Sequence, residues 1–180
     1  MIAEIGHAAL WLAAALAVLQ MVSGALALRA PVGEASPFAL YARPAAVVQA
    51  FFAALAFVTL LYSIALTDLS VKLVATNKLT GTWGNHEGSM LLWVAVLALS
   101  GGLLAYAERR LPERTMSATL SVQGFVALGF YVFLLFSSNP FERLPVPAVE
   151  GIGRNPLLQD IGLAIHPPTL YVGYVGLSVA

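Results

Sequence analysis

The chain has 180 residues, of which 59% are hydrophobic and 10% are charged. A soluble domain carries about 25% charged residues, so the composition excludes an ordinary soluble fold and predicts a membrane protein. The formal net charge is zero and no basic tract is present, which excludes nucleic acid as an expected partner. Cysteine is absent, so the chain can form neither disulfides nor thiolate metal sites.

Apolar segments of membrane-spanning length follow one another along the chain. A bilayer core requires about 20 apolar residues in helical form. Four charge-free segments meet this length, and a fifth begins near Thr169 and has no stop signal before Ala180. We therefore predict an all-α, polytopic transmembrane helix bundle with four full helices and the start of a fifth. The predicted helices lie near residues 9–28, 45–67, 88–107, 115–138 and 169–180, and residues 1–180 form one transmembrane region of a larger protein.

Polar and charged residues predict how these helices face and how they are oriented. Single glutamines interrupt three of the segments and are expected to face other helices (Gln20, Gln49 and Gln123). Lys and Arg are densest in the first and third connections, which should be cytoplasmic. The N-terminus and the fourth connection, residues 139–168, should then be periplasmic. This loop holds six of the ten prolines, so we predict an ordered loop and not a flexible linker.

A histidine stands beside two prolines at the edge of the last segment, in the stretch GLAIHPPTLYVGY. A residue that precedes proline is disfavoured in helix, and Pro168 suits a first helical turn. We therefore expect His166 just ahead of a helix N-terminus, where the dipole favours the neutral, metal-ligating imidazole. Tyr171 and Tyr174 could line the same face of a flat ligand such as haem. An interfacial histidine and two interfacial tyrosines are the alternative, which spacing alone leaves open.

A second cluster, WGNHEGSMLLW, opens the third helix. Asn85 can cap this helix, Glu87 complements its dipole, and Trp83 fits an interfacial aromatic belt. The adjacent His86 and Glu87 could relay protons, bind a quinone or ligate a metal. The competing interpretation is a helix cap with solvated polar side chains, and the sequence does not separate the two.

Four stretches in this order resemble one known family: EIGHAAL at residues 4–10, WGNHEGSMLLW at 83–93, SNPFERL at 138–144 and NPLLQDIGLAIHPPTLYVGYVG at 155–176. On these residues the chain is similar to the N-terminal part of the CcmF-type cytochrome c haem lyases of bacterial system I cytochrome c maturation. The resemblance covers the whole of this chain. It implies a multi-pass protein of the bacterial inner membrane with a periplasmic N-terminus.

The resemblance also implies an activity and its partners. Such proteins receive haem from a periplasmic haem chaperone and join its vinyl groups to the thiols of a CxxCH apocytochrome c, together with thiol-handling and chaperone subunits of the maturation system. His166 matches the first of two periplasmic axial ligands of the transferred haem b. The further candidates at this haem are Tyr171, Tyr174, Arg143, Arg154 and Trp83. The two arginines are either propionate partners or solvated loop residues, and His86 and Glu87 have no assigned role.

Several features of the resembling family are expected beyond Ala180. These are a tryptophan-rich periplasmic segment, the second periplasmic histidine and the ligands of a second, permanent haem, so we do not expect these 180 residues to be active alone. The family also has more residues between Asn77 and Lys78, which puts the length of that loop in question. Two other functions stay open from the residues themselves: a transporter, or a structural or quinone-binding subunit of a respiratory complex.

Overall fold

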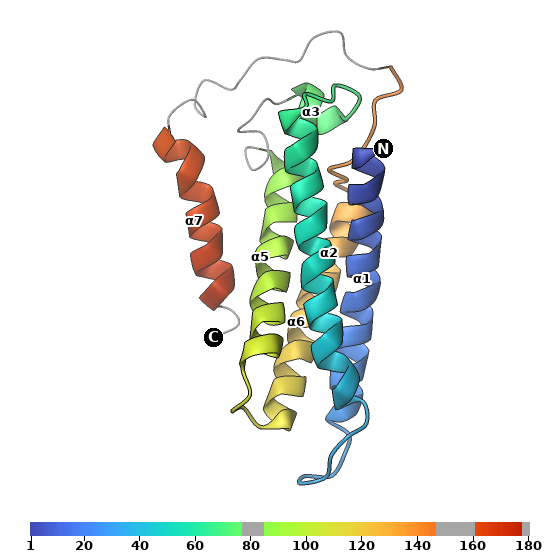
Figure 1. Cartoon of the computed structure of the whole chain (residues 1–180), viewed down its shortest axis with the longest axis vertical. Coiled ribbons are helices and arrows are strands. Elements are labelled where there is room, and N and C mark those ends of the chain that lie inside the picture. Colours follow the sequence, from blue (N-terminus) through green and yellow to red (C-terminus); the bar gives the residue numbers. More distant parts are fainter. Residues whose placement is uncertain (77–84, 147–160, 178–180) are drawn as a thin grey trace.

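The computed structural model describes residues 1–76, 85–146 and 161–177, and these are helical apart from short connections. Four long helices stand side by side in a bundle (Figure 1). A short helix, α3, lies across one end of the bundle, and α7 lies along its flank beside α5. The helices are α1 (Ile2–Ala27), α2 (Ala39–Ala65), α3 (Lys72–Thr76), α5 (His86–Ala107), α6 (Glu113–Phe136) and α7 (Ile161–Leu177).

The predicted all-α transmembrane fold class is confirmed. The helices α1, α2, α5 and α6 are each long and apolar enough to cross a membrane. Two of them begin earlier than predicted: α1 at Ile2 and not near residue 9, and α2 at Ala39 and not near residue 45. The reason is that the charge-free segments mark the apolar part of each helix, while the helices continue into polar ends that reach beyond the hydrocarbon layer.

The fifth helix differs more from its prediction. We expected residues 139–168 to be a loop and a helix to begin near Thr169, but α7 begins at Ile161 and runs through both Pro167 and Pro168. The two prolines have no N–H to donate to the preceding turn, which ordinarily ends or bends a helix. The carbonyls that lose a donor are those four residues before each proline. The Thr169 hydroxyl does not replace these bonds, because it lies within hydrogen-bond distance of the next two carbonyls, those of Ile165 (3.0 Å) and His166 (2.8 Å).

Small and polar side chains fill the seams between the long helices. Alanines that are almost wholly buried line the contact of α1 with α2, for example Ala13 and Ala56. Small side chains let membrane helices approach closely, which replaces the hydrophobic driving force that water would supply. The glutamines also face inward, as predicted: Gln20 and Gln49 are fully buried and Gln123 is 5% exposed.

The two ends of the bundle differ in what they carry (Figure 1). The upper end, as drawn, holds the start of α1, helix α3, the start of α5 and the residues that follow α6. The lower end holds the α1–α2 connection (Leu28–Phe38) and the α5–α6 connection (Glu108–Pro112). All three histidines of the sequence belong to segments that meet at or near the upper end, so the candidate site lies there.

Candidate functional site

His166 lies within a helix and not ahead of one, so that prediction was wrong. It is the sixth residue of α7, and its side chain is exposed. Helical spacing puts Leu170 and Gly173 on the same face, four and seven residues further along. Among the described residues, no atom would lie within 4 Å of a methyl group added at Gly173, so the described part of the chain leaves this face open. The helix-dipole argument for a neutral imidazole is lost, but an accessible imidazole above an open strip of helix remains.

The two tyrosines of α7 lie in different surroundings. The ring of Tyr171 meets the indole of Trp93 on α5 edge to face, with centroids 5.4 Å apart. Val175, one turn further along, is buried, so this face of α7 packs on the bundle. Tyr174 is 70% exposed and lies nearer to the face of His166. Tyr171 therefore holds α7 against α5, and Tyr174 is the tyrosine that a ligand of His166 can reach.

His86 is the first residue of α5 and is held from two sides. Its Nδ1 lies 3.0 Å from the Ser138 hydroxyl, and its ring stands edge-on to Phe133 of α6 with centroids 5.2 Å apart. The predicted cap is confirmed, because the Asn85 side chain accepts from the backbone N–H of Gly88 at 3.0 Å. Glu87 lies in the first turn, where its charge complements the helix dipole.

The residues that follow α6 bind several elements of the upper end together. We call this segment, Ser137–Val146, the strap. Its Phe141 is 5% exposed, and it packs so closely on Gly6 that a methyl group there would lie 2.3 Å from the ring. The amide Nδ2 of Asn139 lies 3.5 Å from Nε2 of His7, the nitrogen that also accepts from the Trp11 indole at 3.1 Å. The strap thus fixes the start of α1.

The strap also pairs with the segment around α3. Backbone bonds join Lys72 N–H to Glu142 O and Leu144 N–H to Ser70 O, both 2.9 Å long. The Lys72 ammonium donates to the Glu142 carboxylate at 2.8 Å, and this hydrogen bond raises the pKa of Lys72 above its usual value. Arg143 pairs with Glu4 of α1 at 2.6 Å and donates to the Ser70 hydroxyl.

These contacts show which of the remaining predicted site residues are already engaged within the protein. Arg143 is engaged with Glu4 and Ser70, so its guanidinium holds the strap to α1. Trp83 and Arg154 lie outside the described residues, as does the loop at Asn77 and Lys78. Sequence reasoning missed the strap as a unit. The strap contains the motif SNPFERL, but nothing in the sequence shows that its polar residues pair with α1, α5 and the segment around α3.

Among the described residues, no group of three or more His, Asp or Glu side chains converges on one point. A free divalent ion would require such a ligand set. A haem brings four nitrogen ligands of its own and asks the protein for only one or two axial groups.

Comparison with known proteins decides the family. A family described as "Cytochrome C assembly protein" matches residues 83–180. The chain belongs to this family. It is 46% identical over its whole length to the cytochrome c-type biogenesis protein CycK of Bradyrhizobium diazoefficiens, and 48% identical to the cytochrome c-type biogenesis protein ccl1 of Rhodobacter capsulatus. In both cases the chain spans 28% of the relative's length.

A solved structure agrees with this assignment. The chain is similar to "Cytochrome c Heme Lyase CcmF" with a TM-score of 0.81 and 26% identity, over 99% of this chain and 29% of that one. The predicted resemblance to the CcmF type is therefore confirmed, and the four membrane-length helices agree with a multi-pass location in the bacterial inner membrane. The transporter and respiratory-subunit alternatives are not favoured by any of these relatives.

Proposed function

We propose that this chain is the part of a cytochrome c haem lyase that holds incoming haem through His166. The observation that carries the proposal is the exposed imidazole above the open face of α7, in a chain whose relatives serve cytochrome c biogenesis. The haem is a substrate here. It would be handed over by a periplasmic haem chaperone and attached to the CxxCH motif of an apocytochrome c.

In this proposal the chain's own residues orient the haem. The Nε2 or Nδ1 of a neutral His166 binds iron, while Gly173 leaves room for a flat ring. Tyr171 and Trp93 hold α7 in place from the opposite face. Each thioether then forms when a substrate thiol adds across a vinyl double bond, with sulfur bonding to one carbon and the proton to the other. Holding both reactants in one geometry supplies the catalysis.

The proposal requires the upper end of the bundle to face the periplasm. Charge supports that orientation. The lower end carries the side chains of Arg29, Arg43, Arg109, Arg110 and Arg114, and the positive-inside rule puts such an end in the cytoplasm. The N-terminus, His86 and His166 then all lie on the side where haem and apocytochrome meet.

A second, permanent haem within the membrane does not fit the described residues. Such a haem needs an axial ligand inside a membrane span, and the histidines of this chain are His7 and His86 at the upper end and His166 on α7. Trp83 and Arg154 remain proposed contacts of the transferred haem, and Tyr174 joins them through its exposure.

The test is a haem titration of the purified full-length protein. His166→Ala should weaken haem binding by at least roughly tenfold and remove the low-spin absorption bands of an axially ligated iron. Leu170→Ala is the matched control, because it changes the same helix face without removing a ligating atom. Added imidazole should restore the low-spin bands of His166→Ala, which distinguishes a lost ligand from a damaged fold.

Unchanged haem affinity and unchanged bands in His166→Ala would contradict the proposal. So would loss of haem in both variants, since the open face and not the imidazole would then be responsible. If His86→Ala instead abolished the low-spin bands while His166→Ala kept them, the ligand would be assigned to α5.

A further inference from the structure

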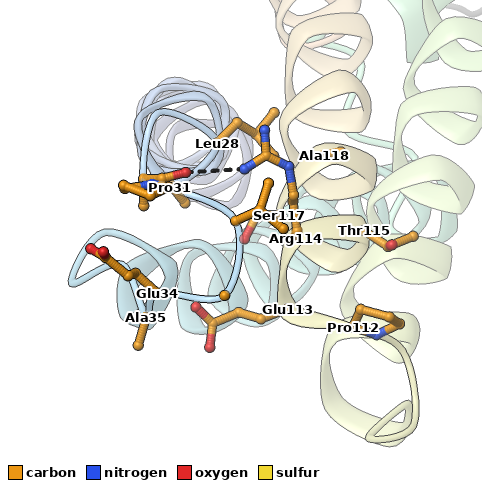
Figure 2. Close-up of a pocket in the computed structure, with 14 residues that line it drawn as sticks. Leu28, Pro31, Glu34, Ala35, Pro112, Glu113, Arg114, Thr115, Ser117 and Ala118 are labelled. Atoms are coloured by element: carbon orange, nitrogen blue, oxygen red, sulfur yellow. Dashed lines mark hydrogen bonds between the residues drawn. The ribbon is translucent and has the colours of Figure 1, made fainter.

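A large cavity lies at the lower end of the bundle, away from the proposed haem site. It has a volume of about 910 Å³, is partly open to the surroundings, and is lined by the end of α1, the α1–α2 connection and the first turns of α6 (Figure 2). Its apolar wall includes Leu28, Pro31 and Val32. The volume lies within the range of about 300–1,000 Å³ that is typical of small-molecule sites.

Three charged side chains line this cavity and differ in sign. Arg114 donates from Nη1 to the carbonyl of Ala30 at 3.1 Å, which holds its guanidinium against the end of α1 and leaves further N–H donors available. Glu34 comes from the connection and Glu113 from the first turn of α6. Figure 2 shows the Arg114 side chain directed toward the end of α1. The carboxylates of Glu34 and Glu113 lie below its guanidinium in this view. The cavity thus has a cationic part and an anionic part.

The level of the cavity relative to the bilayer indicates that its ligand is a lipid. Helix α1 has 26 residues and is therefore about 39 Å long, which exceeds the bilayer core of about 30 Å. With the core of the helix in the hydrocarbon, the ends of α1 and α6 reach the headgroup layer. Val32, in the connection that forms one wall, is 86% exposed and presents an apolar side chain at this level.

We propose that this cavity binds the phosphoethanolamine headgroup of a membrane lipid. The lipid phosphate would lie against the guanidinium of Arg114. The ammonium of the ethanolamine would lie against the carboxylates of Glu34 and Glu113, and the glycerol end would lie on the apolar wall. The charged side chains in the wall sum to one negative charge, which disfavours an anionic headgroup such as phosphatidylglycerol. A choline headgroup has no N–H to donate to the carboxylates, so a primary ammonium is preferred.

Lipid retention by the full-length protein tests this. The protein is reconstituted in nanodiscs that hold phosphatidylcholine with equal minor amounts of phosphatidylethanolamine and phosphatidylglycerol, is extracted into mild detergent, and its retained lipids are counted by native mass spectrometry. Phosphatidylethanolamine should be retained preferentially. The double variant Glu34→Gln/Glu113→Gln should lower that retention roughly tenfold, as expected for loss of a charge-assisted hydrogen bond.

The controls separate this site from other sources of binding. Glu108→Gln removes a carboxylate at the same end that does not line the cavity, and it should leave retention unchanged. Equal retention of phosphatidylcholine, preferential retention of phosphatidylglycerol, or no effect of the double variant would overturn the proposal.

Discussion

The central glutamine of α6 offers the sharpest test of how the bundle is held together. The Gln123 Nε2 donates to the carbonyl of Leu97 on α5 at 2.6 Å, and its Oε1 accepts from the Gln20 amide of α1. The same Gln20 amide donates to the carbonyl of Leu120 at 2.8 Å. Gly101 of α5 leaves the space for this arrangement, because a methyl group there would lie 2.2 Å from the Gln123 amide. We expect Gly101→Ala to force that amide out of position.

The loss in the free energy of unfolding of Gly101→Ala depends on whether the Gln123 amide moves. If the Gln123 amide moves, two interhelical hydrogen bonds are lost, worth about 0.6–1.7 kcal/mol each in membrane proteins. If it stays, the added methyl overpacks the seam at about 1–3 kcal/mol. These are alternatives and do not add. Alanine returns up to about 1 kcal/mol through its better helix propensity. The net loss in the free energy of unfolding should be about 1–2 kcal/mol.

A double-mutant cycle assigns this loss to its cause. Unfolding is followed by circular dichroism in mixed micelles for Gly101→Ala, Gln123→Ala and the double variant. In the Gln123→Ala background the methyl group has room, so Gly101→Ala should then be neutral or stabilising. Gly129→Ala on α6 is the matched control and should not destabilise, because an added methyl group there meets no atom of the described residues within 4 Å. An equal cost of Gly101→Ala in both backgrounds, or a comparable cost of Gly129→Ala, would refute this reasoning.

Two further predictions concern the ends of the bundle. Phe141→Ala should lower the free energy of unfolding by about 3–5 kcal/mol, because removal of the buried ring leaves a cavity beside Gly6. A smaller loss, measured by thermal unfolding, would show that the strap collapses into this cavity. Arg43→Gln should cost about 1–3 kcal/mol, because its guanidinium donates to the carbonyls of Ala105 (3.2 Å) and Glu108 (2.8 Å). Hydrogen exchange should then rise in the last turn of α5, which the control Arg109→Gln should leave protected.

The sequence predicted the bundle well because its signals are local and physical. An apolar stretch of fixed length indicates a membrane helix, and lone glutamines within it indicate contact faces, as Gln20, Gln49 and Gln123 show. The cap at Asn85 was predictable for the same reason, since it depends only on residues three apart.

The strap was not predictable because its contacts join residues far apart in the chain. Arg143 meets Glu4, Glu142 meets Lys72, and Ser138 meets His86, and no local pattern shows which of these partners are brought together. The sequence-based proposal for Arg143 as a propionate partner rested on its location in an outer loop. Its ion pair with Glu4 gives it a structural task at the upper end.

The start of α7 shows where a local rule can mislead. The rule that proline ends a helix rests on a missing N–H and a steric clash, and it placed His166 in extended chain ahead of the helix. In the structure the helix begins at Ile161 and continues through both prolines. The helix dipole therefore no longer favours a neutral imidazole. A metal-binding role for His166 therefore rests on its exposed side chain and on the space beside Gly173, and not on the helix dipole.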